Sequence, residues 1–347
     1  MADTTLRDIA DELNVDISTV SKALNDHPKI SDTTKLRVTK AAKELNYHQN
    51  KIAAALVKGA SNLIGVMVPQ TDEIFFSSII RGIEEVVKNS GYNIIILQSN
   101  DQIEDEIENI NILFQTKVDG ILVSHAMETQ QFDHYRQIID RDIPFIFVDR
   151  YNTSLDTGVV AIDDFKGAYK AVSHLIDQGC RRIAHIAGRK HVHIYKERFR
   201  GYKQALQDHD LSFRDDMVVE SNLKLEAGRT IARKFLKMDP RPDALFAAGD
   251  RVAMGAIQEL KKQNISIPSE MALVGFSNED FCSFVTPTLT SIDQHSRKMG
   301  QKSAKLLVEQ LSNDENKKIS QKTLLNPELI IRESSLQSQS GENNETF

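Results

Sequence analysis

Eleven residues near the start of the chain, VDISTVSKALN (15–25), combine side chains that can read nucleic-acid bases. At helical spacing, Ile17, Ser18 and Lys22 share one face, and the apolar residues of the stretch share the opposite face. Isoleucine can meet a thymine methyl group, a serine hydroxyl can bond several base edges, and lysine can reach guanine O6 or N7. The stretch is rich in hydroxyl and β-branched residues, which are poor helix formers. Its composition therefore favours a helix selected for what its outer face touches, and we predict contact with the major groove of DNA.

Polar and basic side chains around this stretch can hold phosphate groups and fix the register on a duplex. The predicted phosphate contacts are Thr5, Thr19, Ser21, Asn25, Lys29, Thr34, Tyr47 and Asn50, and the predicted base contacts are Leu6, Ile17, Ser18 and Lys22. Charge supports this interpretation, because residues 17–58 carry a net charge of +5 whereas the rest of the chain sums to −11. A basic segment on an acidic body indicates local contact with a polyanion. The alternatives are a solvated charged surface or a three-helix cap without a ligand.

Three short helices must position these side chains. TLRD (5–8) fits a capping box, Asp16 is a plausible N-cap for the base-reading helix, and Ser31 could cap a third helix. The apolar set expected for the third helix is Leu36, Val38, Ala41, Ala42 and Leu45. A tight turn between the first two helices makes a helix-turn-helix, which we place in residues 1–48.

A second group of polar residues follows predicted strands in the remainder of the chain. Asp149 ends a strand, Arg198 opens a helix, Asp250 follows FAAG, and Gln294 follows TSID. Open parallel sheets bind ligands at the carboxyl ends of their strands. A carboxylate, a guanidinium and an amide can together donate to and accept from a polyol. These residues are therefore candidate ligand contacts, with surface salt bridges or helix caps as the alternative.

Alternation of buried strands with amphipathic helices predicts an α/β body with parallel sheets. The strands are expected at 63–68, 93–98, 119–124, 144–149, 159–163, 182–188, 217–220, 243–249, 271–276 and 290–294, with helices between most of them and a last helix at 296–312. The pattern restarts near residue 159, which indicates two lobes. Residues 339–347 are polar, and we expect them to be a disordered tail.

Bulk properties exclude several classes of protein. The 347 residues suggest two or three domains, no run of 18 apolar residues is present, and the N-terminal residues lack the pattern of a secretory signal. With only Cys180 and Cys282, the expectation is a reduced, cytoplasmic protein. The motifs GxxxxGK[ST], GxGxxG after a strand, GxSxG and HExxH are absent, so we expect no enzyme and no cofactor. HVH (191–193) together with His185 could suggest a metal site. The neighbouring cationic side chains would oppose a bound cation, so we favour a pair of loop histidines without a metal.

These segments resemble a known family. TLRDIADELNVDISTVSKALN, SDTTKLRVTKAAKELNY and NKIAAALVKG are similar to the DNA-binding head and hinge of the lactose-repressor/galactose-repressor family, and the similarity continues to LLNPELIIRESS. The resemblance implies a ligand-controlled transcription regulator with a periplasmic-binding-protein-like body. The implied parts are a head (1–48), a hinge helix and linker (49–61), an N-terminal lobe (62–160 plus 291–320), a C-terminal lobe (161–290 plus 321–338) and the tail.

The resemblance also implies roles for single residues. In the hinge, Ala53 and Leu56 occupy minor-groove positions, where an apolar wedge unstacks one base step. The segment 50–58 is too short to be a stable helix alone, so we expect it to be ordered only in some states. In the body, Asp149, Arg198 and Gln294 match sugar-binding positions. The implied partners are a palindromic double-stranded operator, a saccharide-type effector and a second copy of the chain in a dimer.

The body departs from the family pattern at two places. Gly249-Asp250 stands where Asn-Asp is frequent, and Ser277-Asn278 stands where a carboxylate is frequent. A simple neutral hexose is therefore a poor candidate, and Ser277 joins the predicted effector contacts beside Asp250. The lost negative charge favours a larger or an acidic saccharide. The competing functions are a sugar-binding transport component and a cleft enzyme, and the sequence leaves repression or activation open.

Overall fold

The computed structural model describes residues 4–47, 60–312 and 320–336. The chain forms two compact units, residues 1–61 and 62–347. We call the described residues of the first unit up to residue 47 the head, and those of the second unit the body. The division falls at the end of the predicted linker. The predicted phosphate contact Asn50 and the predicted minor-groove contacts Ala53 and Leu56 lie outside the described residues.

Three helices make up the head, and side-chain caps begin each of them. They are α1 (Leu6–Leu13), α2 (Ile17–Leu24) and α3 (Asp32–Glu44). Thr5 and Asp8 form the predicted capping box, and the Asp16 carboxylate accepts a hydrogen bond of 2.7 Å from the Ser18 amide. The Ser31 hydroxyl accepts from the Thr34 amide at 3.3 Å. These caps confirm where the sequence placed the helix starts.

The head buries one small apolar core between the three helices. The fully buried side chains are Ile9, Ala10, Val20, Ala23, Val38, Ala41 and Ala42. The expectation that Leu36 belongs to this core is wrong, because its side chain is 73% exposed. Leu36 stands two residues before Val38, so it points about 200° around the helix from the buried face.

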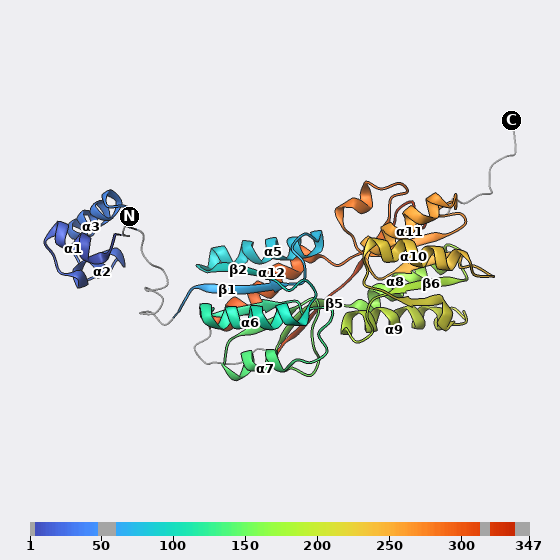
Figure 1. Ribbon diagram of the computed structural model, residues 1–347, viewed down its shortest axis with the longest axis horizontal. Helices are drawn as coiled ribbons and strands as arrows, with labels where there is room; N and C mark the ends of the chain where they lie inside the picture. The colour runs from blue at the N-terminus through green and yellow to red at the C-terminus, as the bar shows by residue number, and fades with distance from the viewer. Residues whose placement is uncertain (1–3, 48–59, 313–319, 337–347) are drawn as a thin grey trace, which may run out of the picture. The chain divides into compact units, whose positions relative to one another are not determined.

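The body contains two six-stranded sheets, each mainly parallel (Figure 1). The first has the order β11-β5-β4-β3-β1-β2 and the second β12-β10-β9-β8-β6-β7; only β12 is antiparallel to its neighbour, β10. Strands of the first sheet are β1 (Leu63–Val68), β2 (Asn93–Gln98), β3 (Gly120–Val123), β4 (Phe145–Val148), β5 (Gly158–Ile162) and β11 (Lys322–Leu325). Those of the second are β6 (Ile183–Ala187), β7 (Val218–Glu220), β8 (Ala244–Ala247), β9 (Ala272–Ser277), β10 (Thr290–Asp293) and β12 (Glu328–Ile330).

Each sheet defines a lobe, and the chain passes between the lobes three times. The passages follow β5, β10 and β11. Two predicted boundaries need correction: residues 291–293 belong to β10 in the second sheet, and residues 322–325 form β11 in the first sheet. Both segments are short strands at which the chain changes sheets, and their sequences do not encode which sheet edge they join. After β10, the chain therefore returns to the first lobe at helix α12 (Ser296–Ser312), which packs against that lobe.

Helices cover both faces of each sheet (Figure 1). The first lobe has α5 (Ile74–Val87), α6 (Ile103–Thr116), α7 (Asp133–Asp140) and α12; the second has α8 (Asp164–Asp177), α9 (His193–Asp208), α10 (Leu225–Leu236) and α11 (Asp250–Lys262). The predicted α/β architecture, with a helical head and a two-lobed body, is confirmed. Among the described residues, no helix is long and apolar enough to cross a membrane.

In two pairs of helices, each helix has a glycine that faces the backbone of the other, which allows the helices to pack closely. A Cβ on Gly255 of α11 would lie 1.9 Å from the Leu225 carbonyl oxygen of α10, and one on Gly228 would lie 2.0 Å from the Val252 oxygen. Gly82 and Gly300 relate α5 and α12 in the same way. Since the obstacles are backbone atoms, a side chain at these positions must push whole helices apart.

We therefore expect Gly255→Ala to lower the free energy of unfolding of the body by about 1–3 kcal/mol, as overpacking does in well-packed cores. Chemical denaturation measures the change. The control is Gly120→Ala, whose added methyl would meet only Leu307 side-chain carbons, at 3.0 Å or more. Those carbons can move, so the control should lose less. Equal losses in the two variants would contradict the assignment of the α10–α11 contact to backbone proximity.

Candidate functional site

The outer face of α2 carries the residues that the sequence selected for base contact. Val20 and Ala23 are buried in the head core, whereas Ile17 is 40% exposed and both Ser18 and Lys22 are exposed. Asn14, in the left-handed conformation with φ 49°, ends α1 and allows the turn into α2. The predicted helix-turn-helix geometry is thus present, and the individual base contacts stay predictions. Leu6 differs from the other three, because it is half-buried against the head core.

The predicted phosphate contacts of the head vary in how free their side chains are. Lys29 is exposed, whereas the Thr5 hydroxyl already donates to the Asp8 carboxylate and the Thr34 hydroxyl is hydrogen-bonded to the Ser31 hydroxyl. Asn25 donates to the Ser21 carbonyl oxygen at 2.8 Å, and Tyr47 packs against the head core. Thr19 and Ser21 are half-buried on α2. The head therefore offers these groups at its surface, and their DNA contacts stay predictions.

A cavity of about 770 Å³ lies between the two lobes of the body. Its walls come from the segments after the carboxyl ends of strands in both sheets, as expected for open parallel sheets. All five predicted effector contacts line this cavity: Asp149, Arg198, Asp250, Ser277 and Gln294. The volume is in the range of sites that enclose small molecules.

Arg198 organises one wall of the cavity. Its side chain is 3% exposed; it donates to Asp164 at 2.8 Å, to the Ala248 carbonyl oxygen at 2.7 Å and to Gln294 at 3.2 Å. Its guanidinium also stacks over the Phe276 ring, 3.7 Å from the ring centroid. Gln294 in turn donates to the Ser277 hydroxyl at 2.8 Å. Arg198 thus positions the Gln294 amide, which in turn positions the Ser277 hydroxyl. Most of the hydrogen-bond donors of Arg198 are therefore used by contacts within the protein.

The two predicted carboxylates of the cavity have different surroundings. Asp250 accepts from the Ser291 hydroxyl at 2.7 Å and from the Glu279 amide at 2.9 Å, so it anchors the loop after β9. Asp149 is 3% exposed, and its Oδ1 has no hydrogen-bond partner among the described residues. Burial raises the pKa of Asp149 to about 6, against the opposing effect of Arg198. Asp149 is therefore the freer of the two acceptors.

The sequence interpretation missed several charged residues of the cavity. Glu73 precedes α5, Asp101 follows β2, Arg150 follows Asp149, and Glu279 comes two residues after Ser277. The same strand-end rule, applied to β1 and β2, would have named Glu73 and Asp101. Glu279 supplies the negative charge that Ser277-Asn278 was thought to have removed. The reason given for expecting an acidic saccharide therefore does not hold in this structure.

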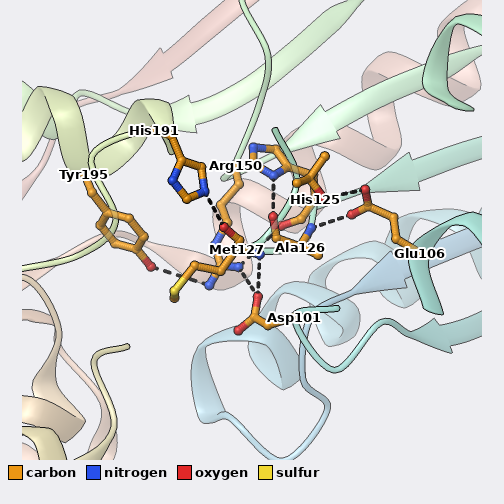
Figure 2. Close-up of polar contacts among 9 residues, drawn as sticks. Asp101, Glu106, His125, Ala126, Met127, Arg150, His191 and Tyr195 are labelled. Carbon is orange, nitrogen blue, oxygen red and sulfur yellow. Dashed lines mark hydrogen bonds and ion pairs between the residues drawn. The ribbon is translucent and has the colours of Figure 1, made fainter. Parts of the chain in front are cut away.

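Polar contacts connect the two lobes beside the cavity (Figure 2). His191 of the second lobe approaches the Met127 carbonyl oxygen of the first through its Nε2, at 2.7 Å. Arg150 pairs with Asp101 and donates to the Tyr195 hydroxyl at 3.4 Å. The lobes are thus linked across the cavity by hydrogen bonds that a change of lobe orientation would have to break.

The first-lobe side of these contacts is held by a buried carboxylate. Glu106 accepts from His134 and from the Thr129 hydroxyl, both at 2.7 Å, and from the Ala126 amide at 2.5 Å. Burial is the largest single effect and raises the pKa of Glu106, but the hydrogen bonds from His134, Ala126 and Thr129 together outweigh it, so the pKa is lowered. Glu106 therefore holds the loop that contains Met127, because it accepts hydrogen bonds from Ala126 and Thr129 on either side of that residue.

The histidines considered for a metal have other contacts. His185 is buried, and its Nδ1 lies 3.0 Å from the Phe246 carbonyl oxygen. His191 reaches Met127, and the His193 ring lies against Tyr151 with centroids 4.6 Å apart. In the described parts of the chain, no group of three His, Cys, Asp or Glu side chains could hold a metal ion.

Comparisons with known proteins agree with this architecture. Residues 5–50 match the model of bacterial regulatory proteins of the lacI family, and residues 172–335 match the periplasmic binding protein-like domain. The ribose operon repressor of Halalkalibacterium halodurans is 31% identical over 308 residues, 89% of this chain and 90% of that protein.

Two solved structures extend the comparison to the fold. A complex of the transcriptional regulator CelR with cellobiose is 26% identical, with a TM-score of 0.72 over 95% of this chain and 99% of that one. The lac repressor dimer bound to operator and the anti-inducer ONPF, at 23% identity, has a TM-score of 0.86 over 97% and 100% of the two chains, and so shows the shared fold. The chain therefore belongs to the lacI family of bacterial regulatory proteins, and it is a DNA-binding transcription regulator with a ligand-binding domain, not an enzyme.

Proposed function

We propose that the chain is a transcriptional repressor that binds a palindromic operator as a homodimer and is controlled by a small polyhydroxylated effector in the cavity of the body. The observation that carries the proposal is this cavity, because both lobes line it and buried polar groups converge in it. A ligand that contacts both walls favours one relative orientation of the lobes over another.

The relatives support each part of this proposal. One relative is named a ribose operon repressor, and one neighbouring structure is a complex with cellobiose. The lac repressor structure is a dimer bound to operator. A twofold-symmetric dimer presents two copies of α2, which suits two half-sites of a palindrome.

Coupling between the sites requires the segment that joins head and body. Residues 49–61 lie between the head and the body in the sequence, and we propose that Ala53 and Leu56 enter the minor groove when operator and dimer order this segment. An effector that favours the lobe orientation in which the two segments separate would weaken operator binding. A coupling free energy of about 1–3 kcal/mol is typical, and it corresponds to a 5–150-fold change in affinity.

Selection from a random-oligonucleotide library with the full chain tests the DNA-binding part. The expected outcome is enrichment of one palindrome, whose affinity falls steeply with salt because phosphate contacts release counterions. Failure to enrich any palindrome at low salt would contradict the proposed operator.

A further inference from the structure

Two buried carboxylate oxygens in the cavity have no hydrogen-bond partner among the described residues. They are Asp149 Oδ1, at the end of β4 in the first lobe, and Glu279 Oε2, after β9 in the second. The two residues are 3% and 8% exposed. Leaving a buried acceptor unpaired costs free energy, and a ligand with donors at this place would recover it.

Three of the four cationic side chains on the cavity lining are already engaged, and the fourth, Lys224, is exposed. Arg198 is bonded to Asp164, the Ala248 carbonyl oxygen and Gln294, and Arg150 is paired with Asp101. Arg251 donates to the Asp72 carbonyl oxygen at 3.0 Å, and its Nε lies 3.9 Å from Glu279. Carboxylates also outnumber cationic side chains on the lining, seven to four. The unmet capacity of the cavity is therefore to accept hydrogen bonds and to bind positive charge.

Glu73 is a third carboxylate of the cavity, and its charge affects both Asp149 and Glu279. It lines the same cavity from the start of α5, and its charge raises the pKa of Asp149 and of Glu279. Burial is the larger cause in both cases, and the two pKa values are about 6 and about 7. The charged groups that face these three carboxylates are Arg150 and Arg198 around Asp149, Asp250, Arg251 and Asp280 around Glu279, and Asp72, Asp101, Arg150 and Arg251 around Glu73.

We propose that the effector carries a protonated amine on a small polyol, and that Asp149, Glu73 and Glu279 hold this ammonium group. The inference rests on the proposed function, because it names the chemical class of ligand for the same cavity. Hydroxyl groups can also donate to carboxylates, but an ammonium group adds a charge attraction to each of the three, beyond what Arg150, Arg198 and Arg251 already supply. A metal ion does not fit as well, since the described residues hold no group suited to one.

The charge has a consequence for pH. An ammonium ion stabilises the ionised carboxylates, so binding lowers their pKa values and releases protons near neutral pH. Affinity is therefore expected to fall as pH decreases through 7 and 6, where Glu279 and Asp149 become protonated. A neutral sugar would show a weaker dependence.

Isothermal titration calorimetry on the full chain tests the inference with matched ligands. The probes are glucosamine, galactosamine and mannosamine, each compared with its parent hexose, its N-acetyl derivative and the corresponding uronate. We expect at least one hexosamine to bind at least about tenfold more tightly than its three counterparts, a difference of about 1.4 kcal/mol. Titrations in buffers of different ionisation enthalpy should show proton release for that ligand.

Isosteric variants locate the interaction. Glu279→Gln and Asp149→Asn should each weaken hexosamine binding at least about tenfold. Both keep the side-chain shape, and asparagine tolerates the left-handed backbone of position 149, where φ is 66°. Asp280→Asn is the control, because it removes the same charge from an exposed neighbour outside this cavity. It should change the affinity less than about twofold, and thermal unfolding verifies that all three variants are folded.

Three results would overturn the inference: a hexose or uronate binding as tightly as its amine, hexosamine binding unaffected by both cavity variants, or no hexosamine binding at about 10 mM. The proposed function has a separate outcome. If a neutral sugar binds the cavity and changes operator affinity, the inference of an ammonium group fails while the proposed function stands. If ligands bind the cavity without changing operator affinity, the proposed function fails.

Discussion

Replacing Arg198 with alanine is expected to lower the free energy of unfolding of the body by about 3–5 kcal/mol, because it leaves the buried Asp164 carboxylate without its cation. The pair is 2.8 Å apart, and both side chains are 3% exposed. The variant also removes the donor that holds Gln294, and hence the Ser277 hydroxyl. We therefore expect effector binding to be lost together with stability. Chemical denaturation and calorimetry measure the two effects.

The control for this prediction is Arg200→Ala, on the same helix α9. Arg200 pairs with Glu197 at the surface, with its side chain 63% exposed, so its loss should cost less than about 1 kcal/mol. In the double variant Arg198→Ala with Asp164→Asn, stability should recover in part, since no buried charge is then left unpaired. Equal stability of the Arg198 and Arg200 variants would show that the buried pair does not have the assigned role.

Lys22→Ala is expected to weaken specific operator binding by about 1–3 kcal/mol for each head, and by roughly twice that for a dimer with two heads. The physical reason is the exposed position of Lys22 on the outer face of α2, from which an ammonium group can reach guanine O6 or N7. Fluorescence anisotropy with the selected palindrome measures the affinity. A duplex with that guanine replaced should bind the wild type and the variant more similarly.

Lys40→Ala is the control that distinguishes loss of a base contact from loss of one positive charge. Lys40 is exposed on α3, with its side chain 77% accessible, so the variant loses the same charge without losing a predicted base contact. It should weaken binding to all duplexes by a similar, smaller amount. If Lys22→Ala also weakened specific and non-specific duplexes equally, Lys22 would be a phosphate contact only.

The head was predictable because its signals are local. The caps at Thr5, Asp16 and Ser31 depend on residues within three positions of each other, and the structure has all of them. Leu36 was assigned wrongly because composition was followed instead of helical angle. Its side chain faces outward, whereas that of its neighbour Lys35 is partly buried and pairs with the exposed Asp26, 2.6 Å away. Periodicity, applied strictly, would have placed Leu36 on the outer face.

The body was predictable in its elements and less so in its long-range pairing. Buried apolar runs identified the strands, but which sheet β10 and β11 join depends on hydrogen bonds to distant strands. The cavity shows the same limit. The rule for strand ends named Asp149 and Gln294, and it would have named Glu73 had it been applied to β1, but that Glu73 and Glu279 line the same cavity became visible only when the two lobes were placed together. A sequence indicates that a carboxylate follows a strand, and the fold decides which carboxylates face one another.

The central claim is that a ligand in the body changes the affinity of the head for operator, and thermodynamic linkage tests it directly. Operator affinity of the full chain would be measured by fluorescence anisotropy with and without a saturating concentration of the hexosamine or sugar that binds the cavity. Affinity of that ligand would then be measured with and without operator. Both affinities are expected to change by the same factor, between about 5 and 150. Operator affinity that is identical at every ligand concentration would contradict it.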